Sequence, residues 1–228
     1  NSVGMESAKS SATLMESLRN SLFIGVISTV IATVLGTALA LSMARSKFPG
    51  KKIVDTVLLL PMVIPEITQG ISLAIFFKII FDYVQGSTGQ NWLPGFGTII
   101  IGHVAFNISY VAIVVRASIE GLSKHYEEAA YDLGANHWQA FWRVTFPLIL
   151  PGIIGGALLA FTLSLDDYLV TFYNKGVGSG TLPIYVYGML KTSVSPEVNA
   201  LSTLMLASST VLVGFSLWLQ GRNGARAD

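Results

Sequence analysis

Cysteine is absent from this chain of 228 residues. That absence excludes disulfides, thiolate metal sites and a cysteine nucleophile. Charged side chains are also scarce, at 12% of the residues against about 25% in soluble domains, while apolar residues make up 52%. Together with a mean hydropathy of +0.61, this balance places the chain in the membrane class.

An excess of charge of either sign is lacking too. The 14 basic side chains nearly balance the 13 acidic ones, so nothing indicates a nucleic-acid partner. Residues 1–20 are polar and contain Glu6 and Glu16. They do not form a signal peptide, because a signal peptide needs a basic start and an apolar core.

Enzymatic and nucleotide-binding motifs are missing as well. The sequence contains neither HExxH nor GxSxG, and its three histidines, His103, His125 and His137, are scattered. We therefore predict no catalytic residue and no metal site. A Gly-x4-Gly-Lys-Ser/Thr loop is also absent, so any ATP that drives this protein has to be bound by another chain.

Five stretches are long and apolar enough to cross a membrane, for which a helix needs about 20 residues. They are residues 22–44, a segment within 53–81, and residues 98–115, 148–165 and 198–219. Only helices and closed barrels satisfy the backbone in lipid, and no alternating pattern of barrel strands is present. The sequence therefore predicts an all-α integral membrane protein with five transmembrane helices.

Lys and Arg gather in alternate loops, which predicts the orientation in the membrane. The loop 82–97 contains neither residue type, and the basic loops are predicted to be cytoplasmic. Their basic residues are Arg45, Lys47, Lys51 and Lys52, then Arg116, Lys124 and Arg143, and finally Arg222 and Arg226. The loop 118–147 and the C-terminus are then inside and the N-terminus outside.

An outside N-terminus without a signal peptide has two explanations. A further span upstream would give six spans with both ends in the cytoplasm, which we favour. Alternatively, residues 1–20 are short enough to be translocated. We divide the chain into a polar N-terminal segment 1–20, a transmembrane domain 21–220 with the cytoplasmic loop 118–147, and a C-terminal tail 221–228.

The second apolar stretch, 53–81, is too long for one straight span, since about 1.5 Å per residue carries it to roughly 44 Å. It contains Pro61 and Pro65, and proline removes a backbone donor and kinks a helix. We expect an interfacial start over 53–56 and then a kinked or broken span. Further along, residues 181–191 predict a short surface or re-entrant helix. Ser195 and Pro196 have the pattern of a cap for the last span.

The polar segment 128–147 lies between two apolar runs and has the pattern of a helical hairpin. Residues 121–133 predict a helix that Gly134 ends, and Asn136 caps a second short helix. The aromatic residues of this second helix are Trp138, Phe141 and Trp142. Two interpretations remain open at this point: a handle that a soluble partner grips, or an interfacial helix lying on lipid headgroups.

This segment resembles the EAA loop of ABC importer permeases. The family pattern is E-A-A-x3-G-x9-I-x-L-P, and the spacing matches at every position. Two departures, Val144 for Ile and Phe146 for Leu, exchange one apolar residue for another. The matching residues are Glu128, Ala129, Ala130, Gly134 and Pro147.

The resemblance implies the fold of the type I importer permeases, with six spans of which the first lies upstream of Ser21. It also implies that the loop docks into a groove of a separate ATP-binding subunit. Glu128 would contact that ATPase, Ala129 and Ala130 would pack in the groove, and Gly134 would make the turn. The chain would then be a transporter subunit and not an enzyme, and ATP and Mg would be bound by the partner ATPase.

Other segments resemble the permeases of spermidine/putrescine importers: residues 45–51, 65–66, 163–167 and 194–201. This resemblance implies polyamine import by alternating access in the bacterial inner membrane. The implied partners are ATP-binding subunits, a second permease and an extracytoplasmic binding protein. A permease for another solute, such as an opine or an aminophosphonate, is the main alternative. An ATP-independent carrier would have no use for the EAA loop, and an intramembrane aspartyl protease would need two facing Asp on separate spans.

Three carboxylates are candidates for the substrate path, since a charge within a membrane is functional by default. Glu66 lies at mid-span beside Pro65, or near the inner headgroups if the span starts late. Asp166 and Asp167 form a negative mouth or a solvated helix end. Two adjacent residues on a helix point about 100° apart, so at most one of the pair faces a pore. A polyamine is a polycation, and carboxylates and aromatic faces are its natural ligands.

Overall fold

The computed structural model describes residues 2–45, 49–123, 125–192 and 203–215, and every regular element within these ranges is a helix. The elements are α1 (Ser2–Arg45), α2 (Lys51–Val63), α3 (Glu66–Thr88), α4 (Phe96–Glu120), α5 (His125–Asp132), α6 (His137–Ala140), the π-helix η1 (Phe141–Thr145), α7 (Phe146–Asp166), α8 (Leu169–Asn174) and α9 (Leu182–Thr192). A further helix covers Thr203–Phe215.

Within the described residues, four helical segments are long and apolar enough to cross a membrane. They are Ala12–Ala44, Glu66–Thr88, Phe96–Glu120 and His137–Asp166. They contain the first, third and fourth predicted spans and part of the second. Of the fifth, 198–219, the described part is the shorter apolar helix Thr203–Phe215, and the rest lies outside the described residues. The prediction of a helical membrane protein is confirmed.

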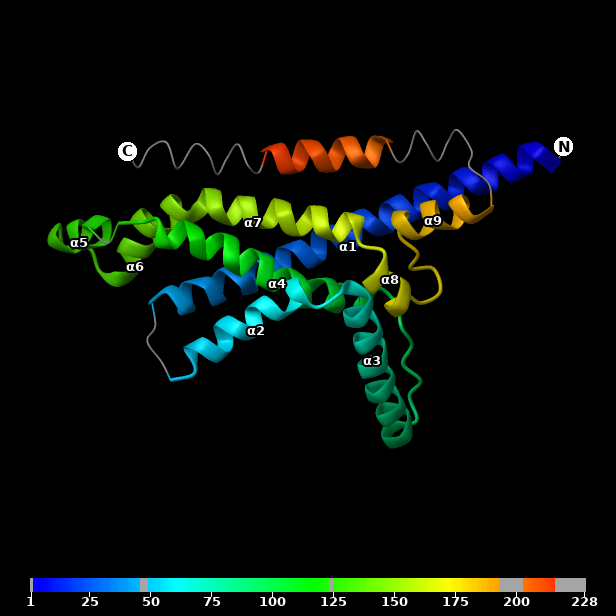
Figure 1. Cartoon of the computed structure of the whole chain (residues 1–228), viewed down its shortest axis with the longest axis horizontal. Coiled ribbons are helices and arrows are strands. Elements are labelled where there is room, and N and C mark those ends of the chain that lie inside the picture. Colours follow the sequence, from blue (N-terminus) through cyan, green and yellow to red (C-terminus); the bar gives the residue numbers. More distant parts are fainter. Residues whose placement is uncertain (1, 46–48, 124, 193–202, 216–228) are drawn as a thin grey trace.

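Helices α1, α4 and α7 pack side by side and form the centre of the molecule (Figure 1). Their core contains Ala40 of α1, Val111 and Val115 of α4 and Ala160 of α7. Small residues let these backbones approach closely, as is usual in membrane bundles. A Cβ placed on Gly156 of α7 would lie 3.4 Å from the Cα of Val111. Gly156, and likewise Gly152 beside Ser118, therefore packs against α4 within the same chain.

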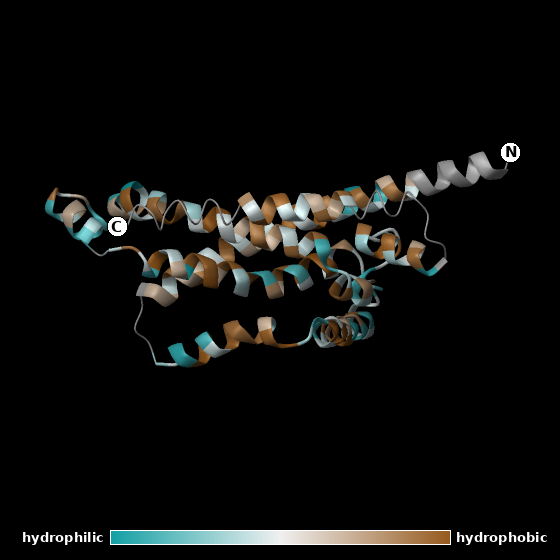
Figure 2. Ribbon diagram, turned by 45° about the horizontal axis from the view of Figure 1, so that its top comes forward, coloured by the Kyte–Doolittle hydropathy of each residue, from teal (hydrophilic) through white to brown (hydrophobic). Residues whose placement is uncertain are grey.

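The second predicted span is broken, as Pro61 and Pro65 predict. Helix α2 ends at Val63, Ile64 is extended, and α3 starts at Glu66 directly after Pro65. The amide of Gln69 donates to the carbonyl oxygens of Pro61 at 2.8 Å and Ile64 at 2.9 Å. Figure 1 shows α3 turning away from the central helices, and Figure 2 shows apolar residues spread over the central helices.

The two ends of the bundle carry different elements (Figure 1). One end, called here the hairpin end, carries α5 and α6. The opposite end carries α8 and α9, and α9 confirms the short helix predicted over 181–191. There the amide of Asn20 donates to the carbonyl oxygens of Gly178 and Gly180, at 3.1 and 2.9 Å. These bonds hold the α8–α9 loop against α1. The predicted cap at Ser195 and Pro196 lies outside the described residues.

The close approach of α1 and α4 makes one glycine sensitive to substitution. A Cβ on Gly36 would lie 2.8 Å from the Cβ of Val111 and 2.9 Å from the carbonyl oxygen of Ile108. We predict that Gly36→Ala lowers the free energy of unfolding by about 1–3 kcal/mol, the usual cost of overpacking a core. Thermal unfolding in detergent, followed by tryptophan fluorescence, measures the change.

Gly86→Ala is the matched control for this substitution. Gly86 also lies within a helix, α3, but a Cβ there meets nothing within 4 Å. Alanine is the better helix former, so this variant should unfold at the same temperature or slightly above it. Equal losses of stability in the two variants would contradict the proposed packing of α1 on α4.

Candidate functional site

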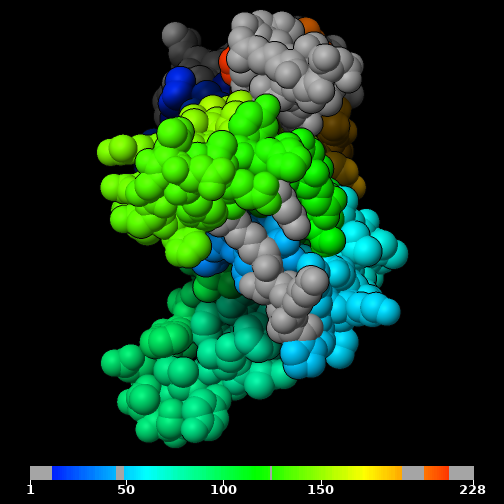
Figure 3. All heavy atoms as spheres, turned by 90° about the vertical axis from the view of Figure 1, so that its left-hand side faces the viewer, coloured from blue at the N-terminus to red at the C-terminus, as the bar shows by residue number. Residues whose placement is uncertain are grey.

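The polar segment between α4 and α7 forms a hairpin of two short helices at the surface of the hairpin end (Figures 1 and 3). Its first helix is shorter than the predicted 121–133. Helix α4 continues to Glu120, Gly121 and Leu122 close a turn on its last carbonyl groups, and α5 begins only at His125. It ends at Asp132, and Gly134 follows with φ at 84°, which favours glycine. Gly134 therefore ends this helix, as predicted.

Asn136 caps the second helix of the hairpin, as predicted from its position. Its side chain accepts a hydrogen bond from the backbone N–H of Gln139 at 2.9 Å, and the Gln139 side chain accepts from the N–H of Asn136 at 3.1 Å. This reciprocal arrangement satisfies two free donors at the helix start. The α-helix is only four residues long and continues as the π-helix η1 into α7. Pro147 is the second residue of α7, and because the helix runs on from η1 into α7, its missing N–H removes one donor from the helical hydrogen bonds at this junction.

Side-chain contacts connect the two arms of the hairpin. Thr145 donates its hydroxyl hydrogen to Glu127 at 2.5 Å, and the Tyr131 hydroxyl lies 3.0 Å from Nδ1 of His137. The aromatic residues of the second arm cluster, with the rings of Trp142 and Phe146 4.9 Å apart. The hairpin therefore has its own internal structure and is not an unstructured loop.

The hairpin exposes both an acid and large apolar side chains. Glu128 is 63% exposed, and its carboxylate contacts Nδ1 of His125 at 3.0 Å. Ala129 is exposed beside it, while Ala130 is partly buried. Leu133 and Trp138 are 89% and 70% exposed. Exposed apolar side chains on a convex, braced element are suited to insertion into a groove of another protein.

Two of the three candidate carboxylates share a pocket in the middle of the molecule. Glu66 at the start of α3 and Asp167 after the end of α7 line it together with the rings of Phe106 and Tyr110. The remaining lining residues are Pro61, Gln69, Leu163 and Val170. Phe106 and Tyr110 lie near the middle of α4 (Phe96–Glu120). Glu66 is, however, also the first residue of the membrane-crossing segment Glu66–Thr88, as the late-start interpretation expects, so its depth in the membrane stays a prediction.

Asp167 is neither a solvated helix end nor an open mouth. Only 7% of the residue is exposed. Its carboxylate accepts hydrogen bonds from the backbone N–H groups of Val170 and Thr171, at 3.2 and 2.8 Å, and so caps α8. It also accepts from Nε2 of His103, at 3.1 Å, and from the Thr171 hydroxyl, at 2.7 Å. Burial with this many donors explains why a carboxylate is tolerated here.

His103 belongs to the surroundings of this pocket, although its sequence position alone does not single it out. Its ring is completely buried on α4 and ties that helix to Asp167. A histidine within an apolar span is itself a signal, but its partner lies 64 residues away and cannot be derived from spacing. Among the described residues, no group of three or more His, Cys, Asp or Glu is placed to hold a metal ion.

Asp166 is not part of this pocket. It is the last residue of α7 and is exposed, and each of its carboxylate oxygens has Ser209 Oγ as a distant partner, at 3.3 and 3.4 Å. The two adjacent acids therefore point in different directions, as their positions at a helix end require. Of the three predicted carboxylates, the structure brings together Glu66 and Asp167 and leaves Asp166 apart.

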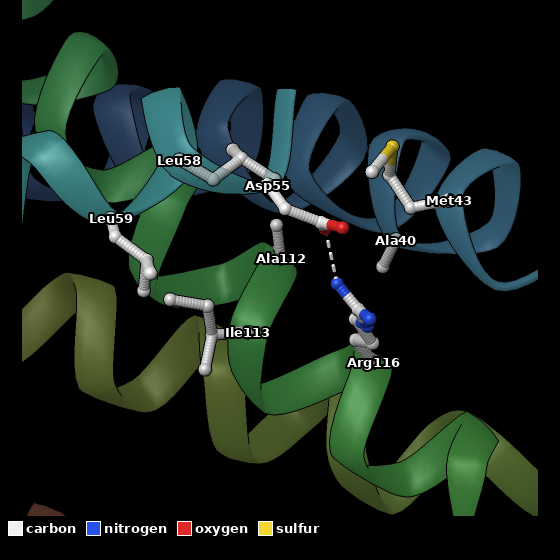
Figure 4. A pocket seen from close by; sticks show the side chains of 8 residues that line it. All are labelled: Ala40, Met43, Asp55, Leu58, Leu59, Ala112, Ile113 and Arg116. Carbon is white, nitrogen blue, oxygen red and sulfur yellow. Dashed lines mark hydrogen bonds and ion pairs between the residues drawn. The ribbon is translucent and has the colours of Figure 1, made fainter. Parts of the chain in front are cut away.

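A second hollow lies between α1, α2 and α4 near the hairpin end (Figure 4). Its lining is apolar except for Arg116 and Asp55, whose Nη1 and Oδ1 atoms are 2.5 Å apart. Arg116 also donates to Glu120 at 2.8 Å. The apolar lining residues are Ala40, Met43, Leu58, Leu59, Ala112 and Ile113. The ion pair of Asp55 and Arg116 joins α2 to α4. Since both charges are already paired, the hollow offers little to a polar ligand.

These features define a helical membrane protein with a braced, exposed hairpin between two of its spans. A family model described as "Binding-protein-dependent transport system inner membrane component" matches residues 14–226. The chain belongs to this family.

Among curated relatives, the chain is 38% identical over 172 residues to the putrescine transport system permease protein PotI of Escherichia coli, and 34% identical over 177 residues to the spermidine/putrescine transport system permease protein PotC of Haemophilus influenzae. These alignments cover 75% and 78% of this chain but 59% and 65% of the relatives. The chain thus spans less than two thirds of their length. The sulfate transport system permease protein CysT of Escherichia coli is 29% identical over 191 residues, 79% of this chain and 67% of that protein.

Solved structures agree on the fold. A chain of an amino acid ABC transporter crystallised with histidines superposes with a TM-score of 0.66 at 18% identity, covering 96% of this chain and 97% of the other. A chain of a bacterial ABC transporter for alginate superposes with a TM-score of 0.72 at 19% identity, covering 91% and 79%. The arrangement of helices is therefore that of ABC importer permeases.

The bonds of Asp167 predict a large difference between two neighbouring acids. Asp167→Ala removes the cap of α8 and leaves buried donors without an acceptor, so we expect a loss of about 2–3 kcal/mol in the free energy of unfolding. Asp166→Ala is the matched control and should change it by less than about 0.5 kcal/mol. Chemical denaturation in detergent distinguishes the two, and equal effects would show that Asp167 does not hold α8 to α4.

Proposed function

We propose that this chain is the permease subunit of an ATP-driven ABC importer for polyamines, and that its hairpin is the contact with a separate ATPase. The observation that carries the proposal is the hairpin itself. It holds the EAA pattern at the family spacing, it lies exposed at one end of the bundle, and it exposes Glu128 as well as large apolar side chains. An interfacial lipid anchor has no need of the internal braces.

Each matched residue has a role in this proposal. Glu128 offers a carboxylate to a basic side chain of the ATPase, and Ala129 and Ala130 are small enough to let the helix enter a groove. Gly134 makes the turn at φ 84°. Pro147 starts α7. Closure of the ATPase subunits around ATP then displaces the hairpin together with the spans on either side of it, α4 and α7, and this displacement drives alternating access.

Polyamines are the proposed cargo because of the pocket chemistry and the named relatives. The pocket is small, about 20 Å³, and the Asp167 carboxylate in its wall is already bonded to His103 and Thr171. The proposed contact with an alkylammonium group is therefore the Glu66 carboxylate with the rings of Phe106 and Tyr110, in a lining without Lys or Arg. The relatives named for putrescine and spermidine share more sequence with this chain than the sulfate permease does. One of the relatives is a sulfate permease, so the family alone does not determine the solute. The acidic lining of the pocket favours a cation over an anion such as sulfate.

The proposal implies several partners and a location. ATP and Mg are bound by the ATPase subunits, a second permease completes the path, and an extracytoplasmic binding protein delivers the solute. The complex lies in the bacterial inner membrane, with loop 118–147 and the C-terminus in the cytoplasm. This orientation places the hairpin where the ATPase subunits are and the α8–α9 end where the binding protein is.

The alternatives differ in what they need from the structure. An opine or aminophosphonate permease would share the hairpin and differ only in solute. An ATP-independent carrier leaves the hairpin without a purpose. An aspartyl protease needs two facing aspartates, whereas Asp167 is bonded to His103 and Thr171 and Asp166 lies apart from it.

The coupling role predicts the effect of one substitution on the outer face. In the complete complex in proteoliposomes, Glu128→Ala should reduce ATP-driven uptake at least about tenfold, the loss expected when one charge-assisted contact disappears. It should also reduce the amount of ATPase that copurifies. Asp132→Ala, an exposed acid on the same helix, is the control and should behave as the original protein. Normal coupling in Glu128→Ala would contradict the proposed role.

The polyamine assignment predicts uptake of labelled putrescine and spermidine by the same proteoliposomes. Glu66→Gln should raise the concentration for half-maximal uptake by about tenfold, because the proposed charge contact with the cation is lost. Asp82→Asn, which removes an exposed acid of α3 paired with Lys78, should leave it unchanged. Complexes whose ATPase responds to a binding protein loaded with another solute, but which import no polyamine, would overturn the cargo and keep the importer.

A further inference from the structure

A side-chain hydrogen bond joins the first helix of the hairpin to the residue directly before α7. Thr145, the last residue of η1, is 1% exposed, and its Oγ1 donates to Oε1 of Glu127 at 2.5 Å. The two residues are 18 positions apart in the chain. A hydrogen bond to a charged acceptor is about twice as strong as one between neutral groups. This bond is therefore a firm tie between α5 and the span that follows the hairpin.

The two neighbouring glutamates of α5 face different ways. Glu127 is partly buried and reaches inward to Thr145, whereas Glu128 is 63% exposed and contacts His125 at the surface. Successive residues of a helix point about 100° apart, which accounts for the separation. One acid of the pair is thus available to a partner, and the other is bonded within the chain.

The backbone route between α5 and α7 is irregular by comparison. It passes through Gly134 at φ 84°, the four-residue α6, the π-helix η1 and Pro147, which lacks an N–H. Short π-helical turns are uncommon and are frequent at functional sites, where they interrupt the regular ladder of helical bonds. A force applied to α5 would be absorbed in part along this route. The bond from Thr145 to Glu127 bypasses Gly134, α6 and most of η1, and joins α5 to the residue directly before α7.

We propose that Glu127, acting through Thr145, is the positioning residue that makes α5 and α7 move as one body. The inference rests on the proposed coupling function of the hairpin and adds a division of labour to it. Glu128 provides the contact with the ATPase, and Glu127 transmits the displacement of that contact to α7. Loss of the Glu127 bond therefore leaves the ATPase attached, but uncouples its ATP hydrolysis from import.

Four variants of the complete complex separate this role from simple stabilisation. Thr145→Val removes the hydroxyl and keeps the shape, Thr145→Ser keeps the hydroxyl, Glu127→Ala removes the acceptor, and the fourth combines Thr145→Val with Glu127→Ala. The measurements are ATPase copurification, ATP hydrolysis stimulated by the loaded binding protein, and labelled putrescine or spermidine imported per ATP hydrolysed.

We expect Thr145→Val and Glu127→Ala to keep the ATPase bound and hydrolysing, with import per ATP reduced about tenfold. The combined variant should be no worse than either single one, because both remove the same bond. Thr145→Ser should stay within about twofold of the original protein, since the hydroxyl donor is retained.

Spin labels give a readout that does not depend on the solute. The chain has no cysteine, so Asp132→Cys on α5 and Leu148→Cys on α7, with cysteine-free partners, place one label on each element. In the original protein the distance between the labels should stay the same with and without trapped ATP. In Thr145→Val and Glu127→Ala it should change when ATP binds, because α5 then moves without α7.

The inference is overturned if both single variants import as much solute per ATP as the original protein and if their label distance does not change when ATP binds. If Glu128→Ala at the same time releases the ATPase, only the division of labour fails. If Glu128→Ala leaves attachment and import unchanged, the proposed coupling function fails with it. Should Thr145→Val not assemble, Glu127→Ala at the surface of the hairpin decides, with the same readouts and the same outcomes.

Discussion

Lipid offers no hydrogen-bond partner to a backbone that leaves its helix, and this constraint governs where the chain can be irregular. At the break between α2 and α3, the Gln69 side chain satisfies the carbonyl groups of Pro61 and Ile64. At the break between α7 and α8, the Asp167 carboxylate satisfies two N–H groups. Thr98 does the same for the carbonyl of Asn174 at the end of α8. Each interruption is maintained by a polar side chain that the apolar surroundings would otherwise exclude.

The candidate cargo pocket lies where two of these interruptions meet. Glu66 starts α3 at the first break, and Asp167 occupies the second, and both line the same pocket. Broken helices give a membrane protein polar backbone and side chains at mid-depth without exposing them to lipid. The same constraint that makes the breaks costly therefore explains why the two carboxylates lie together, and why both are at the ends of helices rather than within them.

The local features of this architecture could be predicted from the sequence, because they depend on neighbouring residues. Pro61 and Pro65 predict the break, Gly134 and Asn136 predict the hairpin, and apolar length predicts the spans. The contacts between distant segments could not be predicted. Nothing in the spacing of His103 indicates that it bonds Asp167. The position of Asp167 near the end of the fourth span predicts a negative mouth or a solvated helix end, and neither includes its partners on α4 and α8. Likewise, the bond of the Glu127 side chain to Thr145 depends on how the hairpin folds back on η1. The spacing of apolar residues along the sequence does not show this fold.

The route by which the hairpin end can influence the pocket follows from the placement of α2. Its first turns are bonded to α4 through Asp55 and Arg116, close to the point where α4 enters the hairpin (Figure 4). Its other end reaches Pro61 and the break beside Glu66, at the pocket. Helix α2 has no buried residue, whereas α1, α4 and α7 share a tight core. A displacement of α4 can therefore move α2 with little loss of packing energy. In the proposed mechanism, α2 therefore links the contact with the ATPase to the position of Glu66. Helix α8 contributes Val170 to the pocket and is bonded to α3 through Asn174 and Gly70.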